Sequence, residues 1–152
     1  MSKERKPQER FVRLDHELLN SVAYLALTCP ARCLLVELLK IFNGKNNGKI
    51  AMGMREAAAR IHGGKDTAHS RFDELCAKGF IKLAKSGWFS SKGSRASEWT
   101  ITCADHDGEP ATNDYLMWQK GQDFDIPKRK PKPSRWAKRK PKLHVVTTAP
   151  AS

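Results

Sequence analysis

Apolar residues in the first half of the chain recur every three or four positions, which is the spacing of helices that bury one face. Asp15 is the expected N-cap of the first helix. Pro30 suits the first position of the second, because its missing N–H would have no partner there in any case. Glycines follow the later segments and end them. The pattern predicts helices over 15–26, 30–42, 54–61 and 65–78.

After Gly79 the apolar period changes to two, which is typical of strands. Ser86-Gly87 is a tight turn, and residues 90–95 form a polar, flexible loop. Residues 49–52 can supply one further short strand. Helices followed by strands indicate an α+β fold. The main strands are expected over 80–85, from Trp88 onward, and over 98–102, and a short helix carrying Tyr115, Leu116 and Trp118 is expected to pack back on the body.

Two tryptophans, Trp88 and Trp99, fall on these strands. Aromatic residues on neighbouring strands usually pair across the strands within a core. We therefore expect both in the core, with stacking on nucleic-acid bases as the alternative.

A short helix, a glycine-containing turn and a second helix make up the helix-turn-helix unit. This order is predicted here, with the first helix at 54–61, the turn at 62–64 and the second helix at 65–78, and a β-hairpin follows. The stretch from Ala58 to Ile81 resembles winged helix-turn-helix DNA-binding domains, and the resemblance covers roughly residues 11–104. Its matching positions are Thr67, Ala68, Phe72, Leu75, Gly79, Phe80 and Ile81.

The wider pattern is similar to small proteins of bacterial prophages and mobile elements, through residues 42–50 and 98–102. The resemblance implies a recognition helix that contacts DNA through its first turns, where free N–H groups also help. Asp66, Asp73 and Glu74 weaken phosphate contact on this face; they could accept from cytosine amino groups or simply support the helix. The expected DNA contacts are Lys65, Thr67, His69, Ser70 and Arg71 on the recognition helix, with Lys92 and Arg95 on the wing.

The net charge of +12 is concentrated at one end of the chain. Residues 11–126 hold fifteen basic and fourteen acidic groups, whereas residues 127–152 hold nine basic groups and no acid. The sequence Lys-Arg-Lys-Pro-Lys occurs there twice, at 128–132 and 138–142. Such a segment cannot bury enough apolar surface to order itself, and it attracts phosphate. The expected DNA contacts in this tail are Lys128, Arg129, Lys130, Lys132, Arg135, Lys138, Arg139, Lys140 and Lys142.

These features divide the chain into four parts. A flexible basic N-terminus covers 1–10, the winged helix-turn-helix domain 11–104, a loop and short packing helix 105–126, and a disordered tail 127–152.

No apolar run is long enough to span a bilayer, and no apolar stretch follows the N-terminal charges, so we expect neither a membrane association nor a signal peptide. Reduced cysteines in a cytoplasm are then the default. Cys29 is placed at the N-cap before Pro30, where the helix field could activate its thiol. No metal, cofactor or small-molecule site and no nucleophile–base set stands out, so we expect no enzyme.

The sequence thus predicts a non-enzymatic, double-stranded DNA-binding protein of the cytoplasm and nucleoid. A transcriptional regulator or replication-associated protein of a bacterial mobile element is the expected setting. An RNA-binding or ribosome-associated protein, and a protein-interaction adaptor with a nucleic-acid-binding tail, are the alternatives. A homodimer through residues 15–28 is possible if Tyr24 and Leu27 face a second subunit; the other interpretation buries that helix in the domain.

Overall fold

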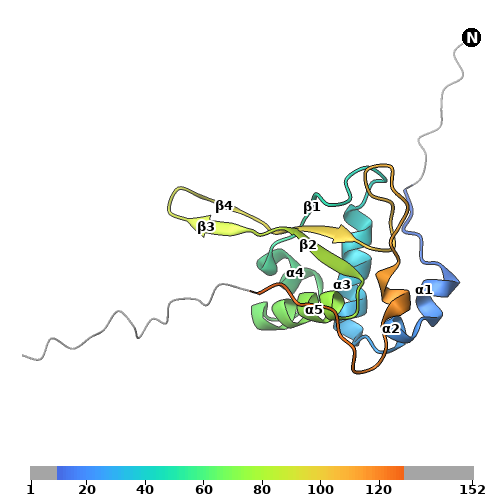
Figure 1. The fold of residues 1–152 in the computed structure, drawn as a ribbon. Coiled ribbons are helices and arrows are strands. Elements are labelled where there is room, and N and C mark those ends of the chain that lie inside the picture. Colours follow the sequence, from blue (N-terminus) through green and yellow to red (C-terminus); the bar gives the residue numbers. More distant parts are fainter. Residues whose placement is uncertain (1–9, 129–152) are drawn as a thin grey trace, which may run out of the picture.

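Helices fill the first half of the molecule and strands dominate the second, as Figure 1 shows for a computed structural model that describes residues 10–128. The α+β class is therefore confirmed. The elements are α1 (His16–Asn20), α2 (Val22–Leu25), α3 (Cys29–Ile41), β1 (Ile50–Ala51), α4 (Met54–Arg60), α5 (Lys65–Ala77), β2 (Ile81–Lys85), β3 (Trp88–Ser90), β4 (Gly93–Arg95), β5 (Glu98–Ile101) and the 3-10 helix η1 (Asp114–Met117).

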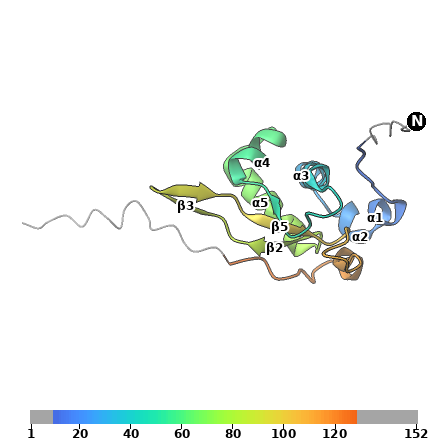
Figure 2. The ribbon, with the colours of Figure 1, turned by 90° about the horizontal axis from the view of Figure 1, so that it is seen from above.

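Three antiparallel strands form the central sheet in the order β1-β5-β2. Ile81 lies opposite Ile101, and Ile50 lies opposite Trp99. Helices α3, α4 and α5 lie on one side of this sheet (Figure 2). Their inner faces meet the strands in one core, in which Phe72 stacks on Trp99 with ring centroids 4.4 Å apart and an interplanar angle of 9°.

The strands β2 and β5 continue outward as a second hairpin made of β3 and β4. Residues 90–95 were expected to form a flexible loop, but Ser90 pairs with Gly93, so only Ser91 and Lys92 make the turn. At Gly87 a Cβ would lie 2.5 Å from the carbonyl oxygen of Arg95, so the chain crosses too closely there for any side chain. The β3–β4 hairpin projects from the body in both views (Figures 1 and 2).

The two strand tryptophans have different environments. Trp99 is buried, as expected, with 3% of its surface exposed. The prediction that Trp88 also lies in the core is wrong, because 53% of its surface is exposed. Trp88 belongs to β3, which lies beyond the three-stranded sheet that the helices cover.

The helix expected over 15–26 is broken in two at Ser21, where ψ is 145°. The Ser21 hydroxyl donates to the Leu18 carbonyl and accepts from the Tyr24 N–H, so it ends α1 and caps α2. Leu27 is buried, and the Tyr24 ring meets Phe80 edge-on at 6.4 Å. Leu27 therefore packs in the core of the chain and Tyr24 is half-buried against it, while a homodimer through residues 15–28 stays a prediction.

The loop before β1 is fixed to the end of the sheet by Asn47, which is 3% exposed. Its amide nitrogen donates to the carbonyls of Ile101 and Ala104, at 2.8 and 2.9 Å. Its amide oxygen accepts from the Ile101 N–H at 2.7 Å. One side chain thus satisfies several buried backbone groups and ties together segments more than fifty residues apart.

The C-terminal part of the described chain folds back on the body through η1, where the short packing helix was expected. Tyr115 stacks on Phe80 with ring centroids 5.0 Å apart. Lys82 of β2 forms an ion pair with Asp114 at 2.5 Å. Burial acts to raise the pKa of the Asp114 carboxyl. The hydrogen bonds from Lys82 and Thr112, together with the charge of Lys82, have the larger effect and hold that pKa below its ordinary value.

We expect Asn47→Ala to lower the free energy of unfolding by about 2–3 kcal/mol, because it leaves buried N–H and C=O groups of Ile101 and Ala104 without partners. Urea unfolding followed by circular dichroism measures this loss. Asn20→Ala, at an exposed position in α1, is the matched control and should change stability by less than about 0.5 kcal/mol. Equal losses of stability in the two variants would contradict a structural role for the Asn47 hydrogen bonds.

Candidate nucleic-acid interface

Helices α4 and α5 are joined by a tight turn that directs one face of α5 away from the body. His62 adopts a left-handed conformation with φ 51°, and the Gly63 N–H closes the end of α4 on the Ala58 carbonyl at 2.9 Å. Gly64 is the N-cap of α5 and supplies no side-chain cap, so the first N–H groups of α5 have no such partner. The inner face of α5 enters the core through Ala68, Phe72, Leu75 and Cys76.

Ser70 faces away from this core with Thr67 beside it, whereas Lys65 lies on the same side as Phe72 and is exposed at the start of the helix. Lys65, Thr67 and Ser70 are exposed, and all three lie in the first two turns of the helix. His69 and Arg71 are half-buried, and both make interactions within the protein. The structure thus leaves Lys65 and Thr67 open to a partner, and the exposed Ser70 hydroxyl, which accepts from Arg71, can still donate.

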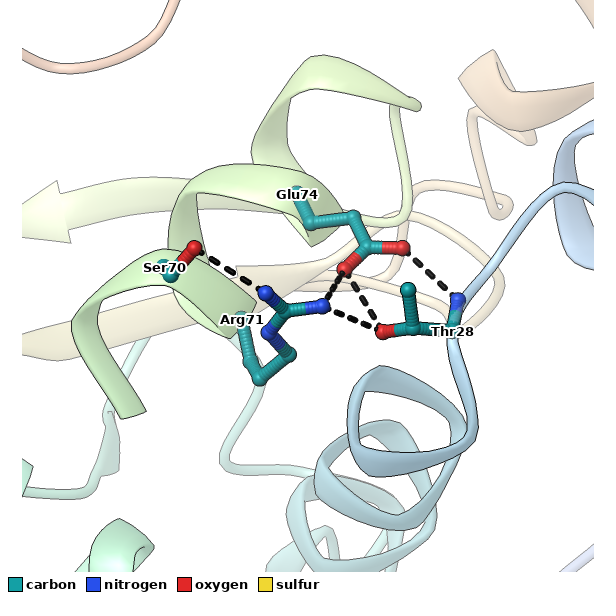
Figure 3. A network of polar contacts seen from close by, with 4 residues as sticks. All are labelled: Thr28, Ser70, Arg71 and Glu74. Carbon is teal, nitrogen blue, oxygen red and sulfur yellow. Dashed lines mark hydrogen bonds and ion pairs between the residues drawn. The ribbon is translucent and has the colours of Figure 1, made fainter. Parts of the chain in front are cut away.

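Arg71 lies at the centre of a polar network between α5 and the start of α3 (Figure 3). Its Nη1 donates to Glu74 Oε2 at 2.7 Å and to Thr28 Oγ1 at 2.5 Å, and its Nη2 donates to Ser70 Oγ at 3.1 Å. These bonds hold the guanidinium within the protein. In the structure as it stands, Arg71 orients neighbouring groups rather than presenting its donors to solvent.

Glu74 completes the network from the other side. Its carboxylate accepts from the Thr28 N–H and from the Thr28 hydroxyl, both at 2.8 Å. Thr28 is the N-cap of α3, and its side chain makes no capping hydrogen bond to that helix. The Glu74 carboxylate of α5 therefore binds the N-terminal end of α3 in its place. Sequence reasoning offered support of the helix as one role for Glu74, but it could not identify Thr28 as the partner.

The two hairpin cations differ in their surroundings. Lys92 is exposed in the turn between β3 and β4 and forms no ion pair among residues 10–128. Arg95 pairs with Glu98 at the start of β5, and 42% of its side chain stays exposed. Lys92 is therefore the more available of the two.

The predicted tail begins at the edge of the described chain. The Phe124 N–H donates to the Ala77 carbonyl at 2.8 Å, and the Phe124 ring covers Gly79. Lys128 is exposed, and the eight tail cations from Arg129 to Lys142 lie outside the described residues. In both views the described chain ends on the side to which the β3–β4 hairpin projects, away from α1, α2 and η1 (Figures 1 and 2).

A cavity of about 610 Å³ lies elsewhere, between the N-terminal segment and the end of the sheet, with Leu18, Cys103 and Tyr115 in its wall. Burial raises the pKa of the Cys103 thiol to about 11 and that of the Tyr115 hydroxyl to about 12. Both groups stay protonated near neutral pH, so neither is a nucleophile there.

No disulfide joins the four cysteines, all of which lie within residues 10–128, and Cys29 and Cys33 lie four residues apart on α3. Thr28, not Cys29, is the N-cap of α3; Cys29 is the first helical residue and is exposed, as is Cys33. Cys76 is buried and Cys103 is partly buried. Within residues 10–128 no three His, Cys, Asp or Glu side chains come together as metal ligands.

No family model, curated protein or solved structure matches this chain. Across the described part of the chain, no helix has both the length and the apolar character needed to cross a membrane. The case for a function must therefore be made from the geometry of the chain itself.

We expect Glu74→Ala to reduce the free energy of unfolding by about 1.5–3 kcal/mol, because Arg71 and the Thr28 N–H and hydroxyl then lose their shared acceptor. Thermal or denaturant unfolding gives the value. Glu17→Ala, which removes an exposed carboxylate of α1, serves as control and should have little effect. The network has no structural role if the two variants unfold alike.

Proposed function

We propose that this chain is a winged helix-turn-helix protein that binds double-stranded DNA without catalysis. The order of α3, β1, α4, α5 and a β2–β5 hairpin supports this proposal, as does the β1-β5-β2 sheet. The observation that carries it is the exposed N-terminal part of α5. The first two turns of this helix expose Lys65, Thr67 and Ser70, and the projecting hairpin carries Lys92.

In this proposal α5 is the recognition helix. An α-helix fits the major groove, which is about 12 Å wide, and its N-terminal residues then reach base edges. Thr67 and Ser70 hydroxyls can donate or accept there, and Lys65 can donate to guanine or to phosphate. The Arg71–Glu74–Thr28 network fixes this helix against the start of α3.

The hairpin would act as the wing. Lys92 at its turn reaches a phosphate or the minor groove, while Arg95 could do so only by exchanging its bond to Glu98. These contacts position the protein on the duplex, and base contacts from α5 supply the sequence preference.

Most of the net positive charge lies outside the described residues. Residues 10–128 hold seventeen basic and fourteen acidic groups, a small surplus. Residues 129–152 hold eight basic groups and no acid. The body would then provide selectivity, and the tail non-specific affinity that falls steeply with salt.

The proposed setting is a regulator of transcription, or a replication-associated protein, of a bacterial mobile element. This part rests on the resemblance of residues 42–50 and 98–102 and of the helix-turn-helix stretch. A cytoplasmic protein associated with the nucleoid follows from DNA binding.

One observation favours a second candidate, a protein-interaction adaptor whose tail alone binds nucleic acid. Asp66 is exposed on the outer face of α5, and Arg71 is engaged within the protein, so Lys65 at the start of the helix is the one exposed cation of α5. A mixed polar face of this kind also suits a protein partner.

Removing residues 129–152 should make the dependence of log affinity on log salt shallower by roughly 5–7 units, because six to eight phosphate contacts are lost. Fluorescence anisotropy with a labelled duplex at several salt concentrations measures both slopes. A full-length variant with the eight tail Lys and Arg residues changed to Gln is the matched control and should behave like the truncated chain.

The same titrations separate the two candidate functions. If α5 reads DNA, the truncated chain still selects its preferred sequence from a genomic fragment pool at low salt. An unchanged slope would show that the tail does not contact phosphate. If the truncated chain loses all sequence preference, the adaptor function is favoured.

A further inference from the structure

The β3–β4 hairpin carries an exposed aromatic side chain that the contacts described above leave unused. Of the three tryptophans in residues 10–128, Trp99 and Trp118 are 3% and 6% exposed. Trp118 donates its indole N–H to Asp123, and Lys78 lies over its ring. Trp88 is 53% exposed on an arm that stands out from the core.

The hairpin holds the Trp88 ring in place. Trp88 lies opposite Arg95 in the strand register, and its six-membered ring reaches across to Gly93. A Cβ at Gly93 would lie 3.4 Å from the ring, so the absence of a side chain there lets the indole rest against the hairpin. The turn itself is made by Ser91 and Lys92, so the ring lies along the arm and does not extend from its tip.

The charge around this ring suits a polyanion. Residues 85–97 contain Lys85, Lys92 and Arg95 and no acidic residue; Glu98, which follows, pairs with Arg95 and lies opposite Lys85, so Lys92 is the cation on this arm that has no ion pair within residues 10–128. An aromatic ring flanked by cations is the arrangement by which proteins bind single-stranded nucleic acid, since bases stack on the ring and phosphates meet the cations.

We propose that Trp88 is a stacking platform for an unpaired base of the bound DNA; this inference rests on the proposed DNA-binding function. Bases in an intact duplex have both faces covered by their neighbours. A side chain that acts as a wedge must enter between stacked pairs from a projecting position. Because the Trp88 ring rests against the hairpin, it can receive a base that is already unstacked. The preferred target is therefore DNA in which a duplex adjoins a single strand.

The test compares a blunt duplex with the same duplex extended by a short single-stranded tail, both bound by the full chain. We expect Trp88→Leu to weaken binding to the tailed DNA roughly 5- to 150-fold, the range for loss of one stacked base. Binding to the blunt duplex should change by less than about twofold. Trp88→Phe keeps a flat ring and should retain most of the affinity.

Met117→Ala is the matched control, because Met117 is 67% exposed on η1, away from the hairpin. It should leave both affinities unchanged. A 2-aminopurine at the first unpaired position gives a direct readout: the wild-type chain should quench its fluorescence on binding, and the Trp88→Leu chain should not.

The outcomes separate this inference from the function on which it rests. Equal loss on the two DNAs, or no loss on either, overturns the role of Trp88 while leaving DNA binding intact. Unchanged 2-aminopurine fluorescence with the bound wild-type chain does the same. Failure of the wild-type chain to bind either DNA at low salt overturns both proposals.

Discussion

The stack of Phe72 on Trp99 is the contact on which the arrangement of the molecule depends. Both rings are buried, and they join the middle of α5 to the central strand of the sheet. This contact fixes the rotation of α5 about its own axis. Neighbouring residues on a helix are about 100° apart, so a shift of one position would place Arg71 or Asp73 where Phe72 lies and turn part of the core outward. The face that α5 offers to a partner is therefore set from inside.

Apolar burial alone does not determine how one element lies against another, because it has no direction. The directional contacts are few and lie at the edges of the core. Glu74 holds the start of α3 through Thr28, and Asn47 holds the loop before β1 to the end of β5. The Arg71 side chain, which resembles a free DNA contact when the sequence is read alone, takes part in the first of these contacts. Arg71 therefore positions α5, the helix proposed to contact DNA, and does not itself face a partner in this structure.

Periodic segments were predictable from sequence, because burial of one face leaves a repeat that local reading detects. The later helices and the strands β2 and β5 therefore appear close to their expected bounds, but Ser86-Gly87, expected as a tight turn, instead leads from β2 into β3, because β2 pairs with β5 and β3 with β4. What could not be predicted depends on partners far along the chain or on one local bond. The break at Ser21 needs a side-chain hydroxyl to bind two backbone groups, the bonds of Asn47 cross more than fifty residues, and the exposure of Trp88 depends on where the helices stop covering the sheet. For the candidate site, spacing placed Lys65, Thr67 and Ser70 in the exposed first turns of the helix but could not show that Arg71 contacts Glu74 and Thr28.

The central claim is that the first turns of α5 and the tip of the hairpin meet the same duplex. Amide chemical shifts of the isotope-labelled full chain, recorded during titration with a duplex selected from genomic fragments, test it most directly. The account predicts that the largest changes within residues 10–128 fall at 65–70 and 91–93, with α1 and α2 unaffected. Changes confined to α1, α2 and η1, with α5 silent while DNA is bound, would contradict it.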